Sequence, residues 1–242
     1  TMALPKIDAP IYDLELPLSK KKIKFRPFLV KEQRNLMMSM ESDEKESIEK
    51  SVRQVLTNCT LTDNFDIDEL PILDVEYYFI QLRARSVGEV VTNRYRCENE
   101  VDGKACGNSM EVKLNLFDIK VDMPSNISDT IQLTPVITMK LRYPKFSVIE
   151  KTSNVEDANE LAFNMIIDSI ENIFDGNQFY YAKETPRQEL IDFVDQLNTE
   201  QFSKIEDFFK NLPRLNKRIE CICGKCGFNH NIEVEGLENF FG

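Results

Sequence analysis

Five of the six cysteines in this 242-residue chain fall into two clusters, and each cluster is flanked by strand-like sequence on both sides. The first cluster holds Cys97 and Cys106, and the second is the run Cys-Ile-Cys-Gly-Lys-Cys-Gly at residues 221–227. Two hairpin tips of this kind that face each other supply four thiolates in a tetrahedron, which is the arrangement that structural zinc takes. A shared metal ion would close a very long loop, where cross-linking removes the most entropy from the unfolded chain.

The sequence therefore predicts one structural zinc ion bound by Cys97, Cys106, Cys223 and Cys226. Glycine follows the second cysteine of each pair and allows the backbone to point its N–H groups back at the sulfurs. Residues 98–105 separate the first pair, which is a longer spacing than usual. This longer spacing is compatible with a shared metal site if residues 101–104 form an extended finger that turns at Asp102-Gly103.

Two other ligand sets remain open at this point. Cys221 has the same strand parity as Cys223 and could replace it. A rival site would use only the C-terminal hairpin, with Cys221, Cys223, Cys226 and His230 as ligands.

Other uses of clustered cysteines fit the sequence less well. Disulfides are disfavoured by the odd number of clustered cysteines and by the lack of a secretion signal. A redox Cys-x-x-Cys opens a helix after a strand, whereas residues 228–234 continue as a strand. A catalytic zinc ion needs an open coordination position, which four cysteines do not leave. We expect Cys59, which lies outside both clusters, to be an ordinary buried thiol.

Composition argues against several classes of function. With 41 acidic and 30 basic residues the net charge is -11, which disfavours broad binding of phosphate backbones. The single histidine cannot form a two-histidine metal centre, and no glycine-rich nucleotide-binding motif is present. No apolar run approaches the roughly 18 to 20 residues that span a membrane. These features predict a soluble, intracellular protein without a membrane span.

Hydrophobic patterns predict an α+β protein, in which a β-rich part with an N-terminal hairpin and a split four-cysteine zinc ribbon packs with helical hairpins. Expected strands cover residues 11–18, 23–30, 90–96, 110–116, 131–133, 136–141 and 179–181. Expected helices cover residues 31–40, 44–56, about 68 or 74 to 86, 155–173, 185–197 and 200–211. The helix after Thr185 carries the pattern of a capping box, with Gln188 as its partner. We expect Met37, Met38 and Met40 to fill gaps in the core, although methionines also suit adaptable binding surfaces.

These elements suggest four segments that form one or two compact domains around a shared zinc site. The segments are residues 2–88 (hairpin and helices), 89–143 (β-rich, with the first cysteine pair), 144–213 (helical) and 214–242 (C-terminal zinc-ribbon hairpin).

Three stretches of the chain resemble a known family. They are residues 4–12 with the Leu-Pro-Leu-Ser that follows, the run Phe-Arg-Pro-Phe-Leu-Val-Lys-Glu at residues 25–32, and the Cys-Gly-Lys-Cys-Gly hairpin that leads to Gly-Leu-Glu-Asn-Phe-Phe at residues 236–241. In these stretches the chain is similar to the baseplate hub proteins of T-even-type contractile-tailed bacteriophages, which include hub subunits and hub assembly chaperones. The resemblance covers residues 4–241.

This resemblance implies a role in virion assembly without catalysis. The partners would be other hub and tail proteins of the phage, met in the host cytoplasm during assembly or in the virion baseplate. Contact surfaces would be the N-terminal hairpin or the pair Phe240-Phe241, although we expect this pair to be tucked into the domain.

Two further functions compete with this one. The alternative is a zinc-ribbon protein that binds nucleic acid or acts in transcription, because basic residues precede both cysteine clusters. Acidic residues beside them offset that charge: Glu98, Glu100, Asp102, Glu233 and Glu235. An enzyme such as a metallohydrolase would need an open zinc site and a general base, and the sequence supplies neither.

Overall fold

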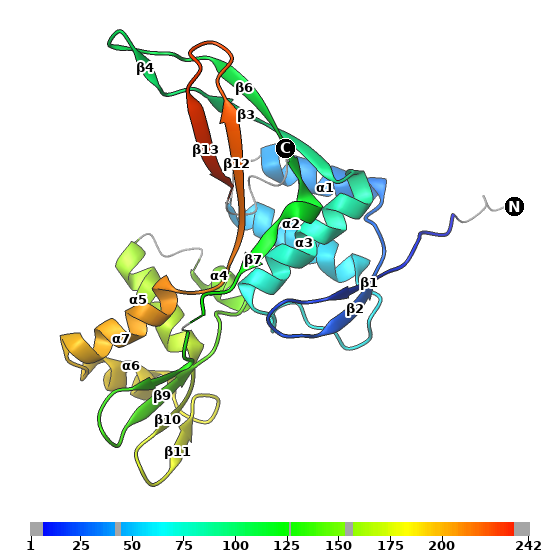
Figure 1. Cartoon of the computed structure of the whole chain (residues 1–242). Helices are drawn as coiled ribbons and strands as arrows, with labels where there is room; N and C mark the ends of the chain where they lie inside the picture. Colours follow the sequence, from blue (N-terminus) through cyan, green and yellow to red (C-terminus); the bar gives the residue numbers. More distant parts are fainter. Residues whose placement is uncertain (1–6, 42–44, 126, 153–156, 235–242) are drawn as a thin grey trace, which may run out of the picture. The chain divides into compact units, whose positions relative to one another are not determined.

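The computed structural model describes residues 7–41, 45–125, 127–152 and 157–234, and it divides the chain into two compact units (Figure 1). The first unit comprises residues 1–67, 73–122 and 214–242, and the second comprises residues 68–72 and 123–213. The second unit is thus inserted into the first. Helices and antiparallel sheets occur in the described part of both units, so the α+β class expected from the sequence is confirmed. The division into four segments stays a prediction.

The first unit opens with the N-terminal hairpin that the alternating sequence predicts. Strands β1 (Tyr12–Glu15) and β2 (Lys22–Phe25) pair antiparallel, with Tyr12 opposite Phe25. The lysine run lies at the turn, where Lys20 adopts a positive φ of 56°. Strand β2 ends before Pro27, which cannot donate to a sheet.

Three helices follow the hairpin: α1 (Val30–Glu41), α2 (Lys45–Cys59) and α3 (Ile72–Val87). Cys59 is fully buried at the end of α2, as expected. Asp74 in the first turn of α3 is also fully buried, and its carboxylate accepts hydrogen bonds from the backbone N–H groups of Leu18 and Ser19 at 2.8 Å each. This carboxylate fastens the loop of the N-terminal hairpin to α3.

Two long antiparallel hairpins form the rest of the first unit. The first pairs β3 (Val90–Arg96) with β6 (Ser109–Asn115), and the second pairs β12 (Arg214–Ile222) with β13 (Asn229–Val234). Between β3 and β6, strands β4 (Glu100–Val101) and β5 (Lys104–Ala105) pair and form the predicted finger. After β6, a short helix η1 (Leu116–Asp118) leads to β7 (Lys120–Asp122), which pairs with β12. Asp102 and Gly103 turn the finger with positive φ angles of 53° and 72°.

An apolar cluster joins the bases of these hairpins to α3. Its buried members include Ile80 and Ala84 of α3, Val91 of β3, Leu114 of β6 and Val234 of β13. Burying several aliphatic side chains of this size contributes roughly 1.5–3 kcal/mol each. The cluster therefore holds the strands that carry the cysteines on a helical base.

The second unit is built around a four-stranded antiparallel sheet with the order β11-β10-β9-β8. Its strands are β8 (Thr130–Gln132), β9 (Thr138–Leu141), β10 (Ile170–Phe174) and β11 (Phe179–Tyr181). Its helices are α4 (Ser147–Thr152), α5 (Ala158–Ser169), α6 (Arg187–Asp195) and α7 (Thr199–Lys210). Residues from this sheet and from α5, α6 and α7 share one core, which includes Met139, Ile170 and Ile205.

Three sequence expectations are wrong. The helix expected at 155–173 ends at Ser169, and residues 170–174 form the inner strand β10; the apolar residues at 170 and 173 suit a buried strand as well as a helical stripe. Thr185 does not cap α6, because its hydroxyl donates to the carbonyl of Tyr181. A capping box lies instead at the start of α7, between Asn198 and Gln201. Met37 and Met38 are 56% and 62% exposed, so they do not fill the core.

Among the described residues, no helix combines the length and the apolar character that a membrane crossing requires. The pair Phe240-Phe241 lies outside the described residues.

Glu76 on α3 provides a test of this packing through pH. Burial raises the pKa of its carboxyl from 4.5 to about 7. Between these values the unfolded chain binds fewer protons than the folded protein, so this group makes stability fall as the pH rises from about 4.5 to about 7. Because the side chain is half-buried, we expect Glu76→Gln to stabilise the protein by about 1–2 kcal/mol at pH 8 and by much less at pH 5. Urea unfolding at both pH values measures this, and an equal effect at both would contradict it.

Candidate metal centre

The two cysteine pairs lie in two turns with the same backbone pattern, one at the tip of each long hairpin. In the first turn, Cys97 N donates to Asn108 O at 2.8 Å and Gly107 N donates to Cys97 O at 3.0 Å. In the second, Cys223 N donates to Phe228 O and Gly227 N donates to Cys223 O, both at 2.8 Å. We call these turns the first knuckle (residues 97–108) and the second knuckle (residues 223–228).

Glycine is required at the same place in both knuckles. Gly107 and Gly227 follow the second cysteine of each pair and have positive φ angles of 65° and 72°. Side chains other than glycine rarely adopt this conformation. The finger formed by β4 and β5 is therefore an insertion into a knuckle of otherwise ordinary geometry, which explains how the long spacing between Cys97 and Cys106 is accommodated.

The structure brings together the four cysteines that the sequence singles out. The Sγ atoms of Cys97, Cys106, Cys223 and Cys226 all lie within 4.8 Å of one another. The Cys97–Cys226 Sγ distance is 3.6 Å and the Cys106–Cys223 distance is 3.8 Å. A Zn–S bond of about 2.3 Å in a regular tetrahedron places the sulfurs about 3.8 Å apart. The spacing of these thiols fits a tetrahedral metal ion.

All six cysteines are free thiols. The Sγ–Sγ distances of 3.6 Å and 3.8 Å are far longer than the roughly 2.05 Å of a disulfide bond. The cluster is thus arranged for coordination by four separate sulfurs.

Hydrogen-bond donors surround the sulfurs. Asn108 Nδ2 lies 3.4 Å from Cys223 Sγ, Asn99 Nδ2 lies 3.7 Å from Cys226 Sγ, and His230 Nε2 lies 3.2 Å from Cys97 Sγ. Lys225 Nζ donates to the carbonyl of Cys106 at 2.9 Å and so links the two knuckles. Such contacts orient thiolate ligands and offset their negative charge.

The local environment shifts the pKa values of two of these thiols in opposite directions. Backbone N–H groups of Cys226 and Lys225, together with the Asn108 side chain, lower the pKa of the Cys223 thiol to about 6. Burial raises the pKa of the Cys97 thiol to about 12. The second knuckle therefore already stabilises a negatively charged sulfur, which is the form that binds a metal.

Cys221 and His230 lie beside this cluster. They face each other in the register of β12 and β13, and Cys221 is half-buried. Neither residue belongs to the group of four that could hold one ion among the described residues. His230 Nε2 lies within hydrogen-bond distance of Cys97 Sγ. Which residues bind the metal stays a prediction.

Sequence reasoning did not single out Asn99, Asn108 or Lys225. The signal available was weak: an amide side chain lies two residues after Cys97, and another lies directly after Gly107. Asparagine in a turn usually bonds to the local backbone. Its contact with a sulfur of the other knuckle becomes visible only once the two hairpins are placed together.

Three of the four clustered cysteines are buried, and Cys226 is partly exposed. Cys97, Cys106 and Cys223 are at most 8% exposed, and Met110 belongs to the same buried cluster. Four sulfurs would complete a tetrahedral coordination sphere.

Comparison with known protein families gives a match that covers most of the chain. The family model described as T4 bacteriophage base plate protein matches residues 9–242. No curated protein and no solved structure matches the chain.

Proposed function

The chain belongs to the T4 bacteriophage base plate protein family, and from this membership we propose that it is a non-enzymatic component or assembly factor of the central baseplate hub. It would act through contacts with other hub and tail proteins, in the host cytoplasm during assembly or in the virion baseplate. The family match over residues 9–242 is the observation that carries the proposal. The resemblance of residues 4–12, 25–32 and 236–241 to hub proteins supports the narrower assignment.

We further propose that Cys97, Cys106, Cys223 and Cys226 bind one structural zinc ion. The sulfur spacing, the two matching knuckles and the donors to the sulfurs support this. Soft thiolate ligands in a tetrahedron favour zinc over the hard cations magnesium and calcium. When bound, the ion would cross-link the two hairpins at their tips, far from the apolar cluster that joins their bases.

The closed shape of this site supports a structural role. Catalytic zinc sites keep one coordination position for water or substrate, and four cysteine ligands would fill all of the positions. The metal would thus stabilise the fold of the first unit.

Charge pairing on the hairpins favours protein partners over nucleic acid. Arg94 lies 3.3 Å from Glu111, Arg218 lies 3.4 Å from Glu233, and Lys217 lies 3.3 Å from Asp118. Three of the basic residues that precede the knuckles therefore lie beside carboxylates. This arrangement offsets the positive potential that phosphate binding needs.

Co-expression tests the proposed role. The full chain is produced together with each hub protein of the same phage, and with peripheral baseplate proteins as controls, and complexes are purified through a tag on the partner. We expect it to co-purify with at least one hub protein at physiological salt. Association with peripheral proteins alone would contradict the hub assignment, and association with none would contradict the assembly role.

A further inference from the structure

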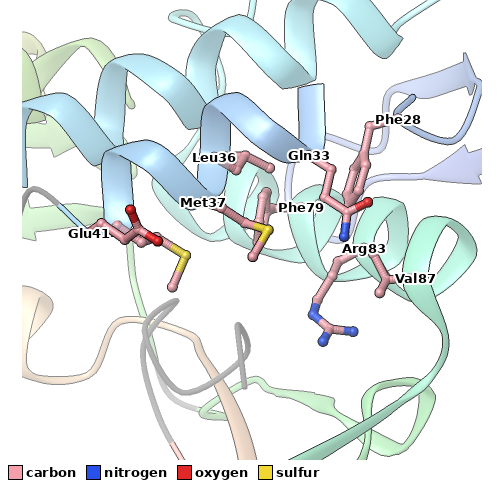
Figure 2. Close-up of a pocket in the computed structure, with 9 residues that line it drawn as sticks. Phe28, Gln33, Leu36, Met37, Glu41, Phe79, Arg83 and Val87 are labelled. Carbon is pink, nitrogen blue, oxygen red and sulfur yellow. The ribbon is translucent and has the colours of Figure 1, made fainter. Parts of the chain in front are cut away.

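A pocket of about 290 Å³ lies in the first unit between α1 and α3 (Figure 2). The apolar part of its lining consists of Phe28, Leu36, Met37, Met40, Phe79 and Val87. Figure 2 shows Met37 on α1 and Phe79 on α3 projecting toward the same space. Met37 and Val87 are more than half exposed. An exposed apolar hollow of this kind is a candidate docking surface.

The last described residue of the chain packs against α3, the helix that forms one wall of this pocket. Val234 is fully buried in one cluster with Ile80 and Ala84 of α3. Each of these two residues directly follows a residue of α3 that lines the pocket, Phe79 and Arg83 respectively. The end of β13 is thus held against the helix that forms one wall of the pocket.

The segment that follows is long enough to reach the whole pocket. Residues 235–242 extend the chain beyond Val234, and an extended segment of this length spans about 26 Å. Residues 80 and 87 of α3 are separated by only about 10 Å along the helix axis. Even coiled as a helix, eight residues span about 12 Å, so the segment can run along the part of α3 that lines the pocket.

The chemistry of the segment matches that of the pocket. Leu237, Phe240 and Phe241 have the i, i+3, i+4 spacing that places side chains on one face of a helical turn. Glu235, Glu238 and Asn239 supply its polar positions. Short amphipathic segments of this pattern dock into apolar grooves through such anchors. Methionine lining suits aromatic anchors, because thioethers make favourable contacts with aromatic rings.

We infer that residues 235–242 of the same chain occupy the pocket between α1 and α3, with Phe240 and Phe241 against Met37 and Phe79. The segment then fastens the end of the second hairpin to α1, so the N-terminal helices and the cysteine-bearing hairpin are held together at a second place. This inference concerns contacts within one chain and does not depend on the proposed function.

A single tryptophan tests the inference, because the chain contains none. Phe241→Trp in the full-length protein makes the emission of that residue specific. We expect an emission maximum shifted to the blue of free tryptophan amide and slow quenching by acrylamide. Adding Met37→Glu or Val87→Glu, which place a charge at opposite sides of the pocket, should shift the emission to the red and speed the quenching. Both positions are exposed, so either variant should fold.

Met38→Glu is the matched control, since Met38 is 62% exposed on α1 and does not line the pocket. It should leave the emission unchanged. Solvent-like emission in Phe241→Trp alone would overturn the inference, as would a blue-shifted emission that neither pocket variant alters. A shift that appears only at high protein concentration would assign the pocket to the segment of a second copy and would also overturn it.

Discussion

Replacing Cys223 with serine is expected to release the bound metal ion and to lower the midpoint of thermal unfolding by roughly 10 °C or more. Structural zinc contributes roughly 10–16 kcal/mol to the folding of zinc-finger peptides. Even a third of that contribution would lower the unfolding midpoint of a domain of this size by about 10 °C. Differential scanning calorimetry measures the effect, and adding a strong chelator to the unaltered protein should reproduce it.

Cys221→Ser is the matched control for this prediction. Cys221 lies two residues before Cys223 in the same strand and is half-buried, but it does not belong to the group of four close sulfurs. Its replacement should leave the metal content and the unfolding midpoint nearly unchanged. If Cys221→Ser were as damaging as Cys223→Ser, the ligand set would be wrong; if neither mattered, the stabilising role of the metal would be wrong.

The second large effect is expected from Glu32→Gln. Glu32 is 2% exposed, and its carboxylate accepts hydrogen bonds from Arg26 Nη2 at 3.1 Å and from the backbone N–H of Leu29 at 2.6 Å. Removing one partner of a buried ion pair costs about 3–5 kcal/mol because it leaves the other charge uncompensated. Arg26 keeps contacts with the carbonyls of Pro27 and Asn58, so we expect the lower end, about 3 kcal/mol, in urea unfolding.

Glu15→Gln is the control for this ion pair. Glu15 pairs with Lys22 in the same N-terminal part of the chain, but both side chains are more than half exposed. Exposed pairs contribute about 0–1 kcal/mol. Similar losses for the two variants would show that burial of Glu32 does not matter.

The pH dependence of Glu32 follows from the same contacts. Burial opposes ionisation, but the hydrogen bonds from Arg26 and Leu29 outweigh it and hold the pKa of Glu32 below its usual value. A depressed pKa stabilises the folded protein above the usual glutamate pKa, and this stability is lost as the pH falls through the lower folded value. Glu32→Gln should therefore cost less at strongly acidic pH than at pH 7.

Local signals in the sequence predicted much of the fold. Alternating apolar residues and Pro27 predicted the N-terminal hairpin. Turn residues such as Asp102-Gly103 predicted the finger at residues 100–105, and strand-like sequence on both sides of each cysteine cluster predicted the long hairpins. Each of these signals acts within a few residues of the chain. The strand at 170–174 was missed because its isoleucines fit the stripe of the preceding helix, and only pairing with β9 and β11 selects the strand.

The same distinction applies to the metal centre. The sequence indicated which cysteines should meet, because their spacing and their glycines record local turn geometry. It did not indicate Asn99, Asn108 or Lys225, whose contacts join residues of different knuckles.

The exposure of Met37 and Met38 was also missed, since helical spacing does not tell whether a partner covers a given face.

The central claim is that four cysteines from two distant parts of the chain hold one zinc ion. Native mass spectrometry of the full-length protein, purified without added metal or chelator, tests it most directly. The expected result is a mass increase of one zinc ion per chain that disappears in Cys223→Ser and persists in Cys221→Ser. A metal-free mass for carefully purified, folded protein would contradict the claim.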